Sequence, residues 1–99
     1  MTEGHYRRSP GVGVISATDD DSGETIIYLA PLPDGPALVL RGSAAAIWTA
    51  VTDTPASSSE IATRVARQRR LPLELVCADV ADFLETLADR GMLVRGPLP

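Results

Sequence analysis

The sequence predicts an α+β fold in which a three-stranded antiparallel sheet is followed by three helices, in a winged helix-turn-helix-like arrangement. Three short runs rich in β-branched and apolar residues occupy the first half of the chain, with turn-forming residues between them. In the second half, the apolar residues change to the spacing of three and four that is typical of amphipathic helices. A length of 99 residues suits one hydrophobic core and therefore one domain.

The predicted strands cover residues 12–18, 25–29 and 37–41. The acidic run 19–23 is expected to form a solvated turn after the first strand, because it lacks the interleaved spacing and the closing glutamate of a calcium-binding loop. Pro31 and Pro33 end the second strand, and Asp34 begins the next turn. Such tight connections favour an antiparallel meander.

Two shorter helices are predicted between residues 43 and 70. Ser43 is placed to cap the first helix. Its apolar face consists of Ala44, Ile47, Trp48 and Val51. Ser57 and Glu60 stand at capping-box spacing and open the second helix. Cations at its end complement the helix dipole, and they are Arg64, Arg67, Arg69 and Arg70.

The third predicted helix is long, amphipathic and acidic. Its apolar face carries Leu73, Val76, Val80, Phe83, Leu84 and Leu87. Its other face carries Glu74, Asp79, Asp82, Glu85 and Asp89. Because like charges at helical spacing repel one another, some of these carboxylates are expected to serve a basic partner. Gly91 is placed to end the helix in a left-handed conformation.

We expect one domain at residues 12–95, preceded by a flexible arm at residues 1–11 and followed by a tail at residues 96–99. The arm has no apolar periodicity and contains turn-forming residues. No apolar run approaches the roughly 20 residues of a membrane span, and none of signal-peptide length follows the start. We therefore expect a cytoplasmic protein with no membrane anchor.

Few residues in the chain are suited to catalysis or to metal binding. His5 lies in the expected arm. Cys77, the only cysteine, lies beside the apolar stripe of the third helix, where a cysteine usually behaves as a small hydrophobe. Neither residue can be assigned to a Cys-His or Ser-His-Asp arrangement. The sequence therefore predicts no enzyme, no metal site and no cofactor.

The net charge of −4 weighs against nucleic acid or an anionic membrane as the partner. An alternative function is a winged-helix transcriptional regulator that uses the four arginines of the second helix. In such a domain the third helix enters the DNA major groove, where its acidic face would repel the phosphates. We therefore predict a module that binds a peptide, and we keep the regulator as the alternative.

Two segments resemble a known family. The first is the run Leu38-Val39-Leu40 followed by Ser43-Ala44-Ala45-Ala46-Ile47-Trp48, and the second is Asp79-Val80-Ala81-Asp82-Phe83-Leu84 with Gly91-Met92-Leu93. Together they resemble the PqqD-like domains, also called recognition elements of ribosomally synthesised and post-translationally modified peptides (RiPPs), which bind the leader peptides of these products. The resemblance covers residues 12–95. Arg41-Gly42 stands where the family often has Leu-Asn before the first helix.

The resemblance implies a binding mode. In such domains the leader adds as an extra strand to the edge of the third strand and lies between that strand and the third helix. The pairing edge would consist of Ala37, Leu38, Val39, Leu40 and Arg41. The helical wall would consist of Val76, Asp79, Val80 and Phe83, with Asp82 or Glu85 at the rim to meet a basic leader residue. Val80 and Phe83 are equally well explained as core residues.

The resemblance also implies a second partner, because a free-standing domain of this kind has to present its leader to enzymes on other chains. In lasso-peptide systems that enzyme is a transglutaminase-like leader peptidase, and in pyrroloquinoline quinone systems it is a radical SAM enzyme. The acidic composition, rich in Ala and Arg, favours the lasso-peptide type.

Overall fold

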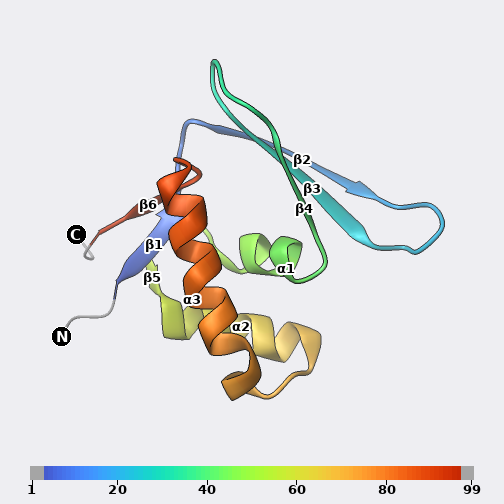
Figure 1. Cartoon of the computed structure of the whole chain (residues 1–99), viewed down its shortest axis with the longest axis vertical. Helices are drawn as coiled ribbons and strands as arrows, with labels where there is room; N and C mark the ends of the chain where they lie inside the picture. Colours follow the sequence, from blue (N-terminus) through green and yellow to red (C-terminus); the bar gives the residue numbers. More distant parts are fainter. Residues whose placement is uncertain (1–3, 97–99) are drawn as a thin grey trace.

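The computed structural model describes residues 4–96 and is shown in Figure 1. Within these residues the chain forms two three-stranded antiparallel sheets and three helices. The strand order is β2-β3-β4 in one sheet and β5-β1-β6 in the other. The predicted α+β class, with a three-stranded sheet followed by three helices, is confirmed.

The first sheet contains the three predicted strands, β2 (Val12–Thr18), β3 (Thr25–Pro31) and β4 (Leu38–Arg41). Consecutive strands pair antiparallel, as expected for a meander. Alternate side chains of β3 and β4 reach the core, where Ile27, Leu29 and Leu40 are buried. The opposite face carries an exposed row of Ile15, Tyr28 and Val39, which lie opposite one another across the three strands.

The second sheet corrects the expectation of a flexible arm at residues 1–11. β1 (His5–Arg8) lies between β5 (Ala56–Ser57) and β6 (Leu93–Arg95) and pairs antiparallel with both. Tyr6 of β1 is buried, with 5% of its surface exposed. A four-residue strand with one inward-facing side chain is too short to show a periodic pattern in the sequence. Its two partner strands lie more than 45 residues away along the chain. Residues 1–3 of the expected arm and residues 97–99 of the expected tail lie outside the described residues.

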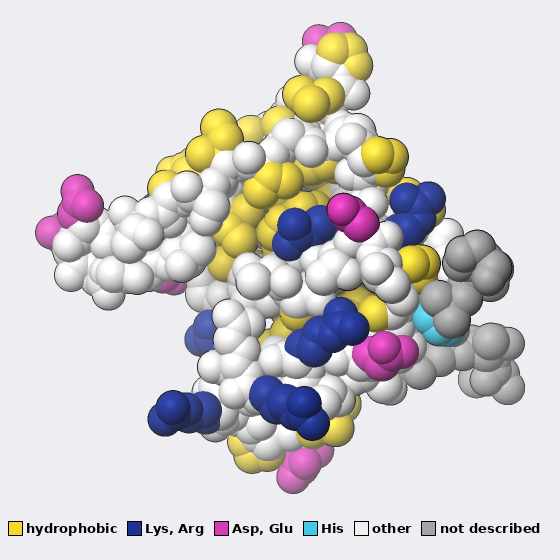
Figure 2. Space-filling model, turned by 180° about the vertical axis from the view of Figure 1, so that it is seen from behind, with side chains coloured by type: hydrophobic (Ala, Val, Ile, Leu, Met, Phe, Trp, Pro, Cys, Tyr) yellow, Lys and Arg dark blue, Asp and Glu magenta, His cyan; other side chains and the backbone are white. Residues whose placement is uncertain are grey.

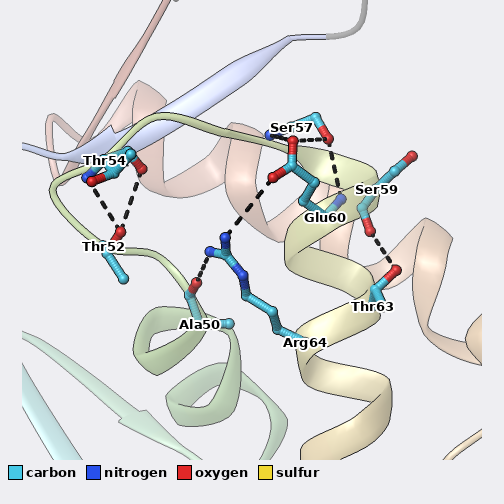
Figure 3. A network of polar contacts seen from close by, with 8 residues as sticks. All are labelled: Ala50, Thr52, Thr54, Ser57, Ser59, Glu60, Thr63 and Arg64. Carbon is cyan, nitrogen blue, oxygen red and sulfur yellow. Dashed lines mark hydrogen bonds and ion pairs between the residues drawn. The ribbon is translucent and has the colours of Figure 1, made fainter.

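The three predicted helices are α1 (Ser43–Ala50), α2 (Ser58–Arg69) and α3 (Leu73–Asp89). The capping box is confirmed: the Ser57 hydroxyl accepts a hydrogen bond from the Glu60 backbone N–H at 3.1 Å, and the Glu60 carboxylate accepts one from the Ser57 backbone (Figure 3). Arg64 then joins α2 to the end of α1, because its Nη1 donates to the Ala50 carbonyl at 2.9 Å. Gly91 follows α3 at φ 79°, as predicted for the residue that ends this helix.

Two local expectations are wrong. Ser43 does not cap α1: the N-cap residue is Gly42 at φ 58°, and no side chain caps this helix. Cys77 is exposed rather than buried. It follows the buried Val76 by one position, and one position turns a side chain by about 100° around the helix axis, which moves it off the narrow buried stripe.

The core lies where α1 meets its neighbours, since α1 packs against α2, α3, β3 and β4. Trp48 of α1 is 1% exposed and belongs to the buried cluster, which also contains aliphatic side chains of α2 and α3. Among residues 4–96, no helix is long and apolar enough to cross a membrane. The arrangement leaves β4 and α3 on two sides of α1.

Candidate functional site

β4 is an edge strand: among the described residues it pairs with β3 on one side and with no strand on the other. Two hydrogen bonds that extend the β2–β3 ladder show which backbone groups face that edge. The Leu32 N–H donates to the Gly11 carbonyl at 2.7 Å, and the Asp19 N–H donates to the Glu24 carbonyl at 2.8 Å. Since bonded pairs alternate along an antiparallel ladder, Ile26 and Tyr28 turn their backbone groups toward β2.

The neighbouring residues Ile27 and Leu29 therefore turn their backbone groups toward β4, where they lie opposite Leu40 and Leu38. By the same alternation, the N–H and C=O groups of Val39 and Arg41 point to the free edge of the sheet. The edge predicted from the sequence thus presents its hydrogen-bonding groups at alternate residues, with the side chains of Leu38 and Leu40 turned inward.

Partly buried hydrophobic side chains lie at the margin of the core on β4, α1 and α3, and α1 packs against the other two elements. These side chains are Leu38 of β4, Ala44 of α1, and Phe83 and Ala88 of α3. Val76 and Val80, which were also predicted to line the wall, are buried at 8% and 1% exposure and act as core residues.

The acidic residues of α3 divide between its two flanks. Residues on a helix are about 100° apart, so Asp79 and Phe83 share one flank while Glu85 lies about 200° from Phe83. The Glu85 carboxylate accepts hydrogen bonds from the Tyr6 hydroxyl of β1 and from Arg95 of β6. In the view of Figure 1, β1 and β6 lie on one side of α3 and β4 lies on the other.

The Glu85 carboxylate, predicted at the rim of the peptide site, is therefore turned toward β1 and β6. Its charge is already met within the fold, because Arg95 pairs with Glu85 and also with Asp89, with 2.8 Å between Arg95 Nη2 and Asp89 Oδ1. The hydrogen bonds from Tyr6 and Arg95 lower the pKa of Glu85. Asp79 and Asp82 are exposed.

The ionisation of Tyr6 is expected to lower the stability of the fold at alkaline pH. Burial, and then the hydrogen bond to Glu85, raise the pKa of Tyr6 from 10.0 to about 12. The stabilisation is therefore complete below pH 10 and is lost as the pH rises from 10 toward 12, where the unfolded chain ionises first. We expect the free energy of unfolding, measured by urea denaturation, to fall by about 1–2 kcal/mol over this interval. Tyr6→Phe should show a smaller fall, and an equal fall in both proteins would contradict this assignment.

Three hollows among the described residues lie away from the β4–α3 surface. One of about 530 Å³ lies beside β1 and β6, one of about 430 Å³ lies between β1, β2 and α1, and one of about 440 Å³ lies between the β2–β3 hairpin and α1 and α2. None of the three is lined by a residue of β4 or α3. A peptide at the β4 edge would therefore lie along an open surface rather than enter one of these hollows.

Comparisons with known proteins identify the family. The family model described as Coenzyme PQQ synthesis protein D (PqqD) matches residues 25–93, which is more than half of the chain and contains β3, β4, the three helices and the start of β6. In the same comparisons, no curated protein and no solved structure matches the chain. The chain therefore belongs to the PqqD family of non-catalytic proteins that bind RiPP precursor peptides.

Proposed function

We propose that this protein binds the leader segment of a RiPP precursor as an added strand on β4 and presents the peptide to a separate processing enzyme. The observation that carries the proposal is the free edge of β4, where the backbone groups of Val39 and Arg41 point outward. Strand addition to such an edge is an established mode of peptide recognition.

Backbone pairing alone supplies little affinity. β4 has four residues, and only its alternate residues face the edge, while each hydrogen bond contributes a net 0.5–1.5 kcal/mol. The added strand would also place every second side chain on the inner side of the sheet. There an apolar leader residue would meet Leu38, Ala44 and Phe83, which lie on the three elements around the site. We assign most of the specificity to these contacts.

Charge is expected to set the orientation of the peptide. Asp79 and Asp82 are exposed on α3, and Asp79 lies on the flank that carries Phe83. A basic leader residue near this flank would be attracted, mainly with an effect on the association rate. Arg41 at the end of β4 would attract an acidic residue at the other end of the bound strand.

The processing enzyme is the second partner in the proposal. A transglutaminase-like leader peptidase and a radical SAM enzyme both remain candidates, and the acidic, Ala- and Arg-rich composition favours the peptidase of the lasso-peptide type. The regulator alternative is less favoured, because α3 exposes Glu74, Asp79 and Asp82 where a recognition helix needs to approach phosphates.

Proline at the β4 edge tests the proposed binding mode. Val39→Pro removes an N–H that points to the free edge and leaves the ladder with β3 intact, so we expect affinity for the fluorescently labelled cognate leader to fall about tenfold in an anisotropy titration. Its matched control is Ser16→Pro, which removes an outward N–H from β2, the opposite edge of the same sheet. Equal affinities for the two folded variants would show that the leader does not pair with β4.

A further inference from the structure

The hollow of about 430 Å³ between β1, β2 and α1 lies near the β2 edge of the sheet, away from β4. Its lining residues are Arg7, Arg8, Ser9, Pro10, Val12, Val14, Trp48 and Asp53. Seen from behind, the middle of the molecule shows dark blue basic side chains on both sides of a magenta acidic one, beside a hydrophobic recess (Figure 2). A chain with a net charge of −4 thus places two guanidinium groups and one carboxylate around a single hollow.

Arg8 covers the indole of Trp48 in this hollow. Its guanidinium carbon lies 4.6 Å from the centre of the ring, and its Nη2 donates to the Trp48 carbonyl at 3.0 Å. Within residues 4–96, however, Nε of Arg8 and Nε1 of Trp48 are buried and have no hydrogen-bond partner. A buried donor without a partner destabilises the fold. Both missing partners are acceptors, which defines the chemistry of a group that would complete the site.

Arg7 adds a third donor group. It lines this hollow and the neighbouring one of about 530 Å³, and its side chain makes no hydrogen bond or ion pair with any described residue. Burial lowers the pKa of Arg8, and the nearby charge of Asp53 opposes that shift. Two guanidinium groups against one carboxylate leave the hollow with an excess of positive charge.

We propose that this hollow binds a carboxylate of a peptide, held by Arg7, Arg8 and the indole N–H of Trp48. The neighbouring Val12 and Val14 would contact an adjoining apolar side chain, and Asp53 would accept a hydrogen bond from a peptide N–H. Because the two unsatisfied donors are shielded from water, the carboxylate has to draw Arg8 away from the face of the indole. The C-terminus of a peptide and an acidic side chain both supply this chemistry.

Trp48 reports on the site directly, because it is the only tryptophan in the chain. The full ¹⁵N-labelled protein would be titrated with N-acetyl-alanyl-leucine, with its C-terminal amide, and with N-acetyl-leucyl-glutamate amide, while the indole N–H resonance is followed by NMR. We expect a saturable shift, with Kd in the millimolar range, for the carboxylate probes and none for the amide. A shift with the first probe alone identifies a C-terminus, and a shift with the third identifies an acidic side chain. No saturable shift, or the same shift with the amide, overturns the proposal.

A pair of variants separates binding at this hollow from general attraction to a cation. Arg7→Gln removes an unpaired guanidinium from the hollow, and Arg67→Gln removes an exposed one from α2 with the same change in net charge. We expect the affinity of the carboxylate probe to fall at least fivefold in the first variant and to stay within twofold of the parent in the second. Equal affinities in the two variants would overturn the assignment.

Discussion

A chain that begins at Ser9 is expected to lose about 4 kcal/mol or more of its free energy of unfolding, measured by urea denaturation with circular dichroism. β1 is the central strand of the β5-β1-β6 sheet, so its removal separates β5 from β6. It also removes the buried Tyr6, and truncation of a large buried aromatic alone costs about 3–5 kcal/mol. Since small domains are stable by about 5–15 kcal/mol, we expect the shortened chain to be partly unfolded at 25 °C.

The matched control for this truncation is Tyr6→Phe. It keeps the buried ring and removes only the hydroxyl that donates to Glu85, so we expect a loss of about 1 kcal/mol. The truncation also removes two hydrogen bonds that Arg8 donates near the end of α1. Its side chain donates to the Trp48 carbonyl, and its backbone N–H donates to the Thr52 carbonyl at 2.9 Å. An unchanged urea midpoint in the truncated chain would mean that residues 1–8 act as a dispensable arm after all.

Phe83→Ala is expected to weaken binding of the cognate leader about 30-fold or more in the anisotropy titration, which corresponds to about 2 kcal/mol. Phe83 is the partly buried aromatic of α3 and lies on the flank that also carries Asp79. In the proposed binding mode, this partly exposed aromatic side chain offers a large contact surface to an apolar leader residue. Its truncation should remove this contact while the core residues behind it remain.

The control on the same helix is Leu75→Ala, which shortens a side chain that is 64% exposed. We expect this variant to bind the leader as the parent does. Because Phe83 also packs against the core, the urea midpoint of each variant is measured, and binding is compared under conditions where both are fully folded. Leader affinity unchanged by Phe83→Ala would show that this side chain serves core packing alone.

The two binding proposals use opposite edges of one sheet. Leader binding depends on β4 and α3, whereas the carboxylate site depends on β1, the start of β2 and Trp48 of α1. Two strand spacings, about 10 Å, separate β2 from β4. A single segment of four or five residues could not occupy both places while paired along β4, so the carboxylate would come from another part of the precursor or from another molecule.

The sequence by itself determined the elements that depend on local periodicity. β2, β3 and β4 follow runs of alternating or continuous apolar residues between turn formers, and α3 follows a stripe from Val76 to Leu87 that repeats at helical spacing. The capping box at Ser57 and the glycine after α3 are also local signals, since each satisfies backbone groups within one helical turn. The resemblance to the PqqD family rested on these same segments, and the family match confirmed it.

The tertiary structure alone decided how distant segments meet. β1 became a central strand because β5 and β6 come to lie on its two sides, and nothing in a four-residue polar run indicates such partners. Glu85 and Asp82 look alike in the sequence and lie only about 60° apart around the helix, so only the position of Tyr6 and Arg95 shows that Glu85 is already paired. The unsatisfied donors of Arg8 and Trp48 likewise arise from contact between residues 40 positions apart, because burial and hydrogen-bond partners are set by packing rather than by neighbours in the chain.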